Sequence, residues 1–276
     1  MKKLLKTCRN IKYKIRGKKY KIPPYSYSFL CEELSKIDDI ESVCFMKHNQ
    51  NSKHRKKRMI IRHDVDLDPW TSLKMAKIEH RYGLVATYFI LHSAKYYKSK
   101  FEETLEISKK IQSLGHEIGL HNDLLTDYFK YGLKPDENLH NILTSLRNNG
   151  INIYGSASHG SKIIQNLNKK LPKEIYYTNY LIFDEIYQKK ISSNPVFSKL
   201  PNPKYNNLSL NLPFLSMKDF NLSYETYFVE MDYYISDTRR KFWFIGNDPI
   251  NTIKSSKLGE TTQLLFHPVW WKLDLE

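Results

Sequence analysis

The sequence predicts an α/β fold in which parallel strands are joined by crossover helices, as an open sheet or a barrel, behind an N-terminal extension. From Met59 onward, short apolar runs typical of buried strands alternate with segments in which apolar residues recur at helical spacing. Glycines close the helical segments at positions 83, 115 and 150, as helix C-termini favour. Strict alternation of this kind is typical of βαβ units.

The elements are expected in a regular order. Residues 1–57 form the extension, with a short helix that has Phe29, Leu30, Leu34 and Ile37 on one side, and residues 58–276 form the main domain. The main domain has expected strands at 59–63, 84–90, 117–121 and 151–159, and expected helices at 70–83, 101–115 and 136–150. Two further strands are expected at 225–236 and 261–271, whereas residues 171–220 are rich in loop-forming residues and have no assignment.

The composition favours a cytoplasmic protein. The chain has 276 residues, 41% of them hydrophobic, which is enough for a large core. It lacks an apolar run long enough for a membrane-spanning helix, and its beginning, "MKKLLKTCRN", has too short an apolar part for a signal peptide. Cys8, Cys31 and Cys44 form no CxxC pair, which fits a reducing compartment and excludes a disulfide framework.

The charge is strongly positive, +15, and is concentrated near the start of the chain. Residues 1–21 hold ten Lys or Arg and no acid, and "KHRKKR" at 53–58 forms a second cluster. No sequence signature of a nucleic-acid-binding module accompanies them, so specific nucleic-acid binding is not expected. The remaining alternatives are a solvated surface, attraction to phosphate-bearing substrates, and peripheral contact with an anionic membrane, the inner face for a cytoplasmic protein.

Chemically active side chains follow several of the expected strands. The stretch "IIRHDVDLDPW" runs from a buried strand directly into carboxylates, and further polar groups close later strands: His63, Asp64, Asp66, His121, His159, Asp237 and His267. Because the carboxyl ends of parallel strands meet at one edge, these groups are expected to lie close together. Buried charges need partners, and a divalent cation satisfies several carboxylates and imidazoles at once.

Some nearby polar residues have structural explanations. The segment "DVDLD" begins like a calcium-binding EF-hand loop, but Pro69 and Met75 stand where that loop needs glycine and glutamate. Asp68 precedes Pro69 and is expected to cap the following helix. His116 has the opposite strand parity to His121 and is expected to be structural.

The motifs "IIRHDVD", "GLVATYFI", "LGHEIGLHND" and "LLFHPVWW", in this order, resemble those of the polysaccharide deacetylase family, the NodB-homology domain of carbohydrate esterases. The resemblance covers Met59 to Trp271 and is closest to a branch with "HDVD" in its first motif. It implies a distorted (β/α) barrel, here expected with seven strands, and a metal held by one aspartate and two histidines. By position, it implies Asp64 as catalytic base, Asp66 and His121 as metal ligands, and His267 as the residue that assists the leaving group.

Two departures from the family pattern leave the third metal ligand open. Leu125 stands where the second histidine of the family's His-x-x-x-His pair belongs, and "SASHG" replaces the third motif. His159 is the favoured third ligand because it closes a strand, with His63 and Asp123 as alternatives, unless the metal site is degraded. His63, Asp237 and Trp270 are expected to contact substrate, Trp270 as a stacking platform.

The resemblance implies a metal-dependent hydrolase, with zinc as the metal by ligand preference. The expected reaction removes an N-acetyl or O-acetyl group from a sugar in a cell-surface polysaccharide or in its nucleotide-linked or lipid-linked precursor. The alternative is a deacetylase-like protein that binds carbohydrate without catalysis, which the loss of a histidine at Leu125 would permit. A metal-dependent phosphohydrolase is a more distant alternative.

Overall fold

The computed structural model describes residues 13–15, 18–20, 25–51, 53–171, 173, 176–193, 204–205, 208–209, 214–237 and 248–274. Most of the basic segment 1–21, and with it the predicted membrane contact, lies outside the described residues. Two of its pieces, β1 (Tyr13–Ile15) and β2 (Lys18–Tyr20), pair as antiparallel strands.

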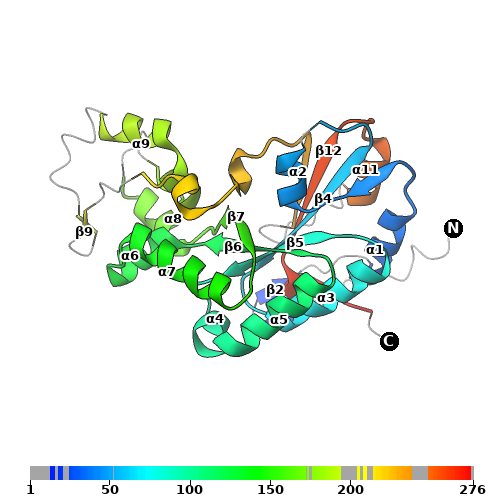
Figure 1. Cartoon of the computed structure of the whole chain (residues 1–276), viewed down its shortest axis with the longest axis horizontal. Helices are drawn as coiled ribbons and strands as arrows, with labels where there is room; N and C mark the ends of the chain where they lie inside the picture. The colour runs from blue at the N-terminus through cyan, green and yellow to red at the C-terminus, as the bar shows by residue number, and fades with distance from the viewer. Residues whose placement is uncertain are drawn as a thin grey trace. The chain divides into compact units, whose positions relative to one another are not determined.

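In the described residues the main sheet has eight strands: seven follow the order β10-β7-β6-β5-β4-β12-β11, and β3 pairs with β4 outside this path (Figure 1). Its strands are β3 (Ile40–Ser42), β4 (Lys57–Val65), β5 (Ala86–Leu91), β6 (Glu117–Asn122), β7 (Ile153–Ser158), β10 (Tyr224–Glu225), β11 (Tyr233–Ser236) and β12 (Thr261–Phe266). The pairings of β10 with β7, β6 with β7, β11 with β12, β12 with β4 and β3 with β4 are all parallel. This curled parallel sheet with intervening helices confirms the predicted α/β fold, a distorted (β/α) barrel.

Helices precede the main sheet and connect its strands. They are α1 (Tyr27–Ser35), α2 (Phe45–Gln50), α3 (Pro69–Arg81), α4 (Lys95–Ser99), α5 (Phe101–Ser113), α6 (Leu124–Tyr131), α7 (Pro135–Asn148), α8 (Lys162–Asn168), α9 (Glu185–Ser192) and α11 (Pro249–Ser255). Asp68 caps α3 as predicted, because its Oδ1 accepts hydrogen bonds from the backbone N–H groups of Trp70 and Thr71 at 3.0 and 3.1 Å. Among the described residues, none of the helices combines the length and the apolar character needed to cross a bilayer.

The remaining short elements are 3₁₀ turns and a small hairpin. The turns are η2 (Asn179–Phe183), η3 (Met217–Phe220), η4 (Thr226–Phe228) and η6 (Pro268–Trp270), and the hairpin pairs β8 (Lys204–Tyr205) with β9 (Leu208–Ser209). In the described part of 171–220, the segment that has no assignment from the sequence, the elements are η2, α9, β8, β9 and η3.

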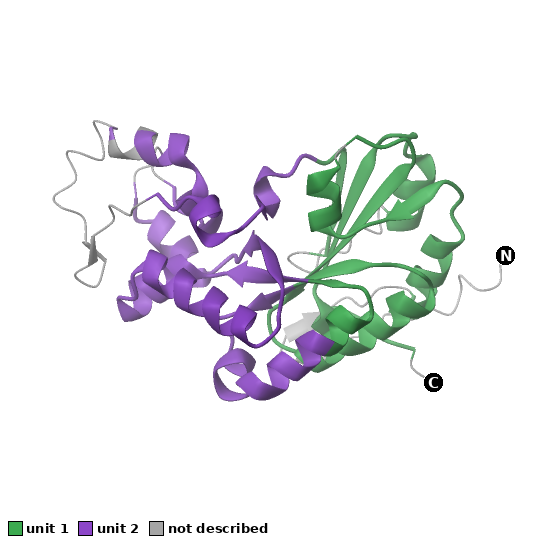
Figure 2. Cartoon of the chain, in the orientation of Figure 1, with its two compact units in different colours: residues 1–88, 110–117, 231–276 green, residues 89–109, 118–230 purple. Residues whose placement is uncertain are grey.

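The chain divides into two compact units, coloured separately in Figure 2. Unit 1 consists of residues 1–88, 110–117 and 231–276, and unit 2 of residues 89–109 and 118–230. In unit 1, the buried Tyr27 of α1 contacts Phe266 and Trp271 edge-on, at ring-centroid distances of 5.7 and 5.3 Å. The described residues 25–57 thus share a hydrophobic core with the last strand.

Unit 2 has its own core around β6 and β7. Gly119 lies against the ring of Phe89, and Gly155 lies against the ring of Tyr224; a Cβ at either position would overlap the ring beside it. Both aromatic residues are fully buried. The two glycines therefore allow aromatic side chains to pack directly against the strand backbone.

Several details of the sequence prediction are wrong. The strand expected at 261–271 ends at Phe266 as β12, and the turn η6 follows it. The single strand expected at 225–236 is instead the two-residue β10, the turn η4 and the shorter β11. Tyr227 and Phe228 are exposed, which the alternating apolar pattern did not distinguish from burial. Phe29 is 44% exposed and lies outside the buried side of α1, unlike Leu30 and Leu34.

Candidate metal centre

The strand register of unit 1 brings several of the predicted polar residues to one end of the sheet. In the parallel pairs, His63 of β4 lies beside Phe266 of β12, and Leu265 of β12 lies beside Ser236 of β11. The residues that follow these positions include Asp64 and Asp66, Asp237, and His267. The expectation that they gather at the carboxyl ends of the strands is confirmed for this unit.

Asp64 is held by an arginine from its own strand. Arg62 Nε donates to Asp64 Oδ1 at 2.7 Å, and Arg62 Nη2 donates to Oδ2 at 2.9 Å. Both side chains are buried. The two parallel bonds fix the plane of the carboxylate and satisfy its charge. Arg62 was not predicted, although residues two apart on a strand share a face.

His267 and Asp237 form a second buried pair. His267 Nδ1 lies 2.6 Å from Asp237 Oδ1, and the other carboxylate oxygen accepts from the backbone N–H of His267 at 2.8 Å and from Trp271 Nε1 at 3.3 Å. Burial opposes a charged imidazole, but the Asp237 carboxylate, followed by Asp66 and Asp64, raises the pKa of His267 to about 9. The imidazolium is therefore its main form at neutral pH.

The outward side of this pair faces a predicted metal ligand. His267 Nε2 lies 3.9 Å from Asp66 Oδ2. Trp270 stacks on the His267 ring, with ring centroids 4.1 Å apart and an interplanar angle of 27°. Trp270, predicted to contact substrate, thus lies against His267, which is predicted to assist the leaving group. Asp237, also predicted to contact substrate, is fully buried and contacts His267 and Trp271.

His121 and His159 are neighbours in unit 2. His121 of β6 pairs with Ala157 of β7, and the two imidazole centroids are 5.1 Å apart. His121 Nδ1 lies 2.8 Å from the Ala157 carbonyl oxygen. Since a carbonyl can only accept, Nδ1 must carry the proton, and Nε2 is then the lone-pair nitrogen of the neutral ring. That is the form in which an imidazole binds a metal.

A buried carboxylate holds His159. Asp123 Oδ2 lies 3.2 Å from His159 Nδ1 and also accepts a hydrogen bond of 2.6 Å from the Ser93 hydroxyl. Burial opposes the charge of Asp123, but the contacts with His159, followed by Ser93, lower the pKa of its carboxyl group. The Asp123 backbone N–H in turn donates to His92 Nε2 at 2.9 Å, and His92 Nδ1 lies 3.3 Å from Asp127.

Asn179, the first residue of η2, connects these groups and is itself fully buried. Its side-chain amide donates to the His159 carbonyl at 2.9 Å and to Asp123 Oδ1 at 3.3 Å, and its Oδ1 accepts from the Leu125 N–H at 2.9 Å. The sequence did not indicate the roles of Asn179, His92 and Asp127. Asn179 lies in the segment without assignment, and no local pattern indicated partners more than fifty residues away along the chain.

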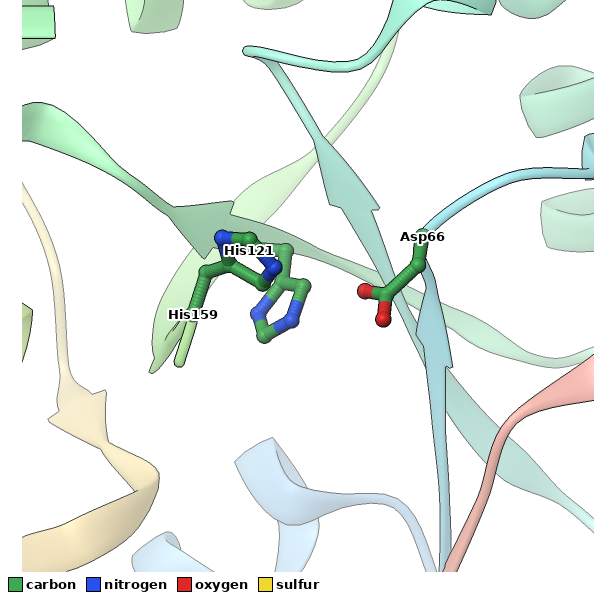
Figure 3. A group of neighbouring side chains, drawn as sticks. All are labelled: Asp66, His121 and His159. Carbon is green, nitrogen blue, oxygen red and sulfur yellow. The ribbon is translucent and has the colours of Figure 1, made fainter. Parts of the chain in front are cut away.

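Asp66, His121 and His159 form a group that could hold a metal ion. Each offers one ligand atom, and the three atoms lie within 4.8 Å of one another. Figure 3 shows the Asp66 carboxylate and the two imidazoles directed toward a common region. One carboxylate oxygen and two imidazole nitrogens are a donor set found in catalytic zinc sites, which keep further coordination positions open. Among the alternatives for the third ligand, the group contains His159, whereas Asp123 contacts His159 from behind.

The third alternative, His63, has different surroundings. It is fully buried, its Nε2 lies 2.6 Å from Glu79 Oε1, and it stacks on Tyr88 with ring centroids 4.3 Å apart. It is not among the residues brought to the metal group, and its predicted substrate contact finds no support in these interactions. His116, predicted to be structural, accepts from the Ala86 N–H at 3.1 Å and lies 2.9 Å from the Ala76 carbonyl oxygen.

Comparison with models of known protein families and with curated proteins gives no match for this chain.

Proposed function

We propose that this protein is a metal-dependent hydrolase that removes an acyl group, most simply N-acetyl, from a sugar. The observation that carries the proposal is the group formed by Asp66, His121 and His159, with Asp64 and His267 beside Asp66. The motif resemblance to polysaccharide deacetylases supplies the substrate class. It favours a sugar of a surface polysaccharide or of its nucleotide-linked or lipid-linked precursor.

The residues fit a divalent metal, and zinc is the best match to two imidazoles and one carboxylate. When bound there, such a metal lowers the pKa of a water molecule and polarises an acyl carbonyl. The ligand histidines are already oriented, His121 by the Ala157 carbonyl at 2.8 Å and His159 by Asp123 at 3.2 Å. Their orientation lowers the cost of assembling the site.

Asp64 is the base in this proposal. It lies two residues before Asp66 on the same strand end, and Arg62 holds both of its oxygens in a fixed plane. As water attacks the acyl carbon, Asp64 accepts the proton that the water loses. The fixed carboxylate plane limits the directions from which that proton can be taken.

His267 is the acid. Asp237 holds its Nδ1, so its Nε2 is directed at Asp66, 3.9 Å away. When the carbon–nitrogen bond of the amide breaks, His267 donates a proton to the departing amine nitrogen. Asp237 is thus a positioning residue that acts through His267, and Trp270 restricts the other face of the ring by stacking on it.

The main rival is a carbohydrate-binding protein without catalysis. Leu125 is buried at the start of α6 and cannot bind metal, which on its own would favour the rival. The grouping of His159 with Asp66 and His121 supports the enzyme instead, because three ligands suffice for a catalytic zinc site.

Metal content tests the proposal. The purified full chain is stripped with a chelator, reconstituted with Zn²⁺ and assayed for bound zinc and for acetate release from N-acetylated sugars. One zinc per chain and zinc-dependent acetate release are expected, with zinc lost in Asp66→Ala, His121→Ala and His159→Ala. His140→Ala is the matched control, since His140 lies exposed on α7.

Two results would sink the proposal: a reconstituted chain that holds no zinc, or acetate release that survives chelation. Full zinc occupancy in His159→Ala would remove that residue from the ligand set.

A further inference from the structure

Three aromatic side chains of unit 2 gather on two short turns that are far apart in the sequence. Tyr180 of η2 and Tyr227 of η4 stack with ring centroids 4.4 Å apart and an interplanar angle of 14°. Phe228 meets the Tyr180 ring edge-on, at 6.0 Å and 87°. Tyr227 is 58% exposed and Phe228 is 40% exposed, so much of this aromatic platform (Tyr180, Tyr227 and Phe228) is open to solvent.

The first turn is tied to a metal-ligand candidate. Asn179, directly before Tyr180, donates through Nδ2 to the His159 carbonyl at 2.9 Å. The same amide group reaches Asp123, which holds the His159 ring. Because Asn179 is fully buried and bonded on both sides of its amide, the position of Tyr180 depends on the backbone at His159.

The second turn is tied to the same strand end by a different residue. Glu225 of β10 is fully buried, and its Oε1 accepts a hydrogen bond of 3.0 Å from the backbone N–H of Ser158, the residue before His159. β10 also pairs in parallel with β7, with Glu225 beside Ser156. The turn η4 begins at the next residue. These contacts therefore fix the start of the turn that carries Tyr227 and Phe228, beside β7.

The buried side chains of Asn179 and Glu225 thus place exposed rings beside His159, the metal-ligand candidate. The hydrophobic effect alone would have favoured burial of these rings. A pyranose ring presents a face of C–H groups bordered by hydroxyls, which matches tyrosine rings with an apolar face and a polar edge. Three rings are too few for a stable protein interface, which covers about 800 Å² per partner. We infer that the aromatic platform is a subsite that binds one sugar ring of the substrate, next to the sugar unit that is deacylated.

This inference rests on the proposed function, because it identifies the occupant from the chemistry proposed at His159. It also narrows the substrate: a platform beside the reacting unit favours a chain of at least two sugar units over a single N-acetylated sugar.

Calorimetric titration of the zinc-loaded full chain tests the subsite. The probes are a tetramer of N-acetylglucosamine and the monomer. We expect Tyr227→Ala to raise the Kd of the tetramer about tenfold, the amount that burying one ring face would supply. Tyr227→Phe keeps the ring and should retain most of the affinity. Tyr131→Ala is the matched control, because Tyr131 is 52% exposed and contacts Lys98 and Lys130 rather than the platform.

Several results would overturn the inference: an unchanged tetramer Kd in Tyr227→Ala, equal losses for tetramer and monomer, or no tetramer binding by a chain that retains zinc. Zinc loss in Tyr227→Ala would show that the ring supports the fold instead. Weaker binding of that variant to phosphatidylglycerol vesicles, with unchanged tetramer binding, would assign the rings to a membrane surface. Failure of the proposed function is separate: tetramer binding would still depend on Tyr227, but acetate would not be released.

Discussion

Two histidine–carboxylate pairs of unit 1 have the same contact distance and opposite surroundings. His63 Nε2 lies 2.6 Å from Glu79 Oε1, and both side chains are fully buried. His267 Nδ1 lies 2.6 Å from Asp237 Oδ1, but the His267 side chain is 10% exposed and its second nitrogen faces Asp66. His63 lies on β4, and His267 directly follows the neighbouring strand β12.

The surroundings decide what each pair can do. Around Glu79, the hydroxyl groups of Tyr27 and Tyr88 also donate to the carboxylate, and His116 lies 3.6 Å away. All of these groups are interior, so the His63 pair stabilises the fold. Around His267, one nitrogen is held by Asp237 and the other is directed at a candidate metal ligand, so that pair is placed for proton transfer.

The largest expected effect is on the buried His63–Glu79 pair. Glu79→Gln should lower the free energy of unfolding by about 3–5 kcal/mol, because it leaves His63 buried beside an uncharged amide. Urea denaturation followed by circular dichroism measures the change. Glu103→Gln, at a half-exposed ion pair with Lys100, is the matched control and should shift stability by less than about 0.5 kcal/mol. A loss below about 1 kcal/mol in Glu79→Gln would remove the distinction between the two pairs.

A change in the His267–Asp237 pair should alter the activity. Asp237→Asn should lower the rate of acetate release about a hundredfold, because the amide neither fixes His267 nor stabilises its imidazolium. Zinc content should stay at the wild-type level, since Asp237 is not a ligand candidate. Unchanged turnover, or zinc loss that accounts for the whole effect, would contradict the role given to this pair.

A third histidine–carboxylate pair, His159–Asp123, should behave like neither. Asp123→Asn should weaken zinc binding roughly tenfold, because the residue orients a ligand without binding the metal itself. Competition with a chromogenic chelator measures the affinity. Asp136→Asn, an exposed change in the first turn of α7, should leave it unaltered. Equal affinities in the two variants would mean that His159 needs no positioning.

The smallest expected effect is the pH dependence of stability that arises from the buried groups around Glu79. Burial lowers the pKa of His116 below 6.5, because it outweighs the attraction of the Glu79 carboxylate. The pKa of the buried Glu79 carboxyl group lies below 4.5, because the attraction of His63 and the hydrogen bond to it outweigh burial. Both groups bind protons more readily in the unfolded chain. Stability should therefore fall as the pH drops below about 6.5, and further below about 4.5, by at most about 1.4 kcal/mol per pH unit for each group.

Denaturation midpoints between pH 8 and pH 4 give the slope. In Glu79→Gln, the decline below pH 4.5 should be reduced. A slope identical to that of the wild type would show that the acid sensitivity arises elsewhere.

Much of the fold and part of the candidate site could be predicted from local patterns. Alternating strands and helices, the cap at Asp68, and the gathering of Asp64, Asp66 and His267 at strand ends all follow from periodicity and residue chemistry over a few positions. The same periodicity contained two signals that were not used. Strand alternation places His63 on the opposite face from Asp64, and it places Arg62 on the same face.

The third ligand candidate could not be identified in this way. His159 follows its strand in a loop, where neither period applies, and its orientation depends on Asp123 and Asn179. Asn179 comes from an irregular segment whose contacts are distant in the sequence. In the segment 225–236, Glu225 likewise bonds to a distant partner, the backbone N–H of Ser158.

By itself, the sequence determined the α/β class, the order of its central elements and the supply of metal-binding side chains at the ends of strands, because each depends on spacing along a short stretch of chain. Only the tertiary structure decided which histidine is sealed against Glu79, which one faces Asp66 and which one joins His121. Those outcomes depend on burial and on distances between residues far apart in the chain. The free energy of a charged or hydrogen-bonding group changes most with that environment.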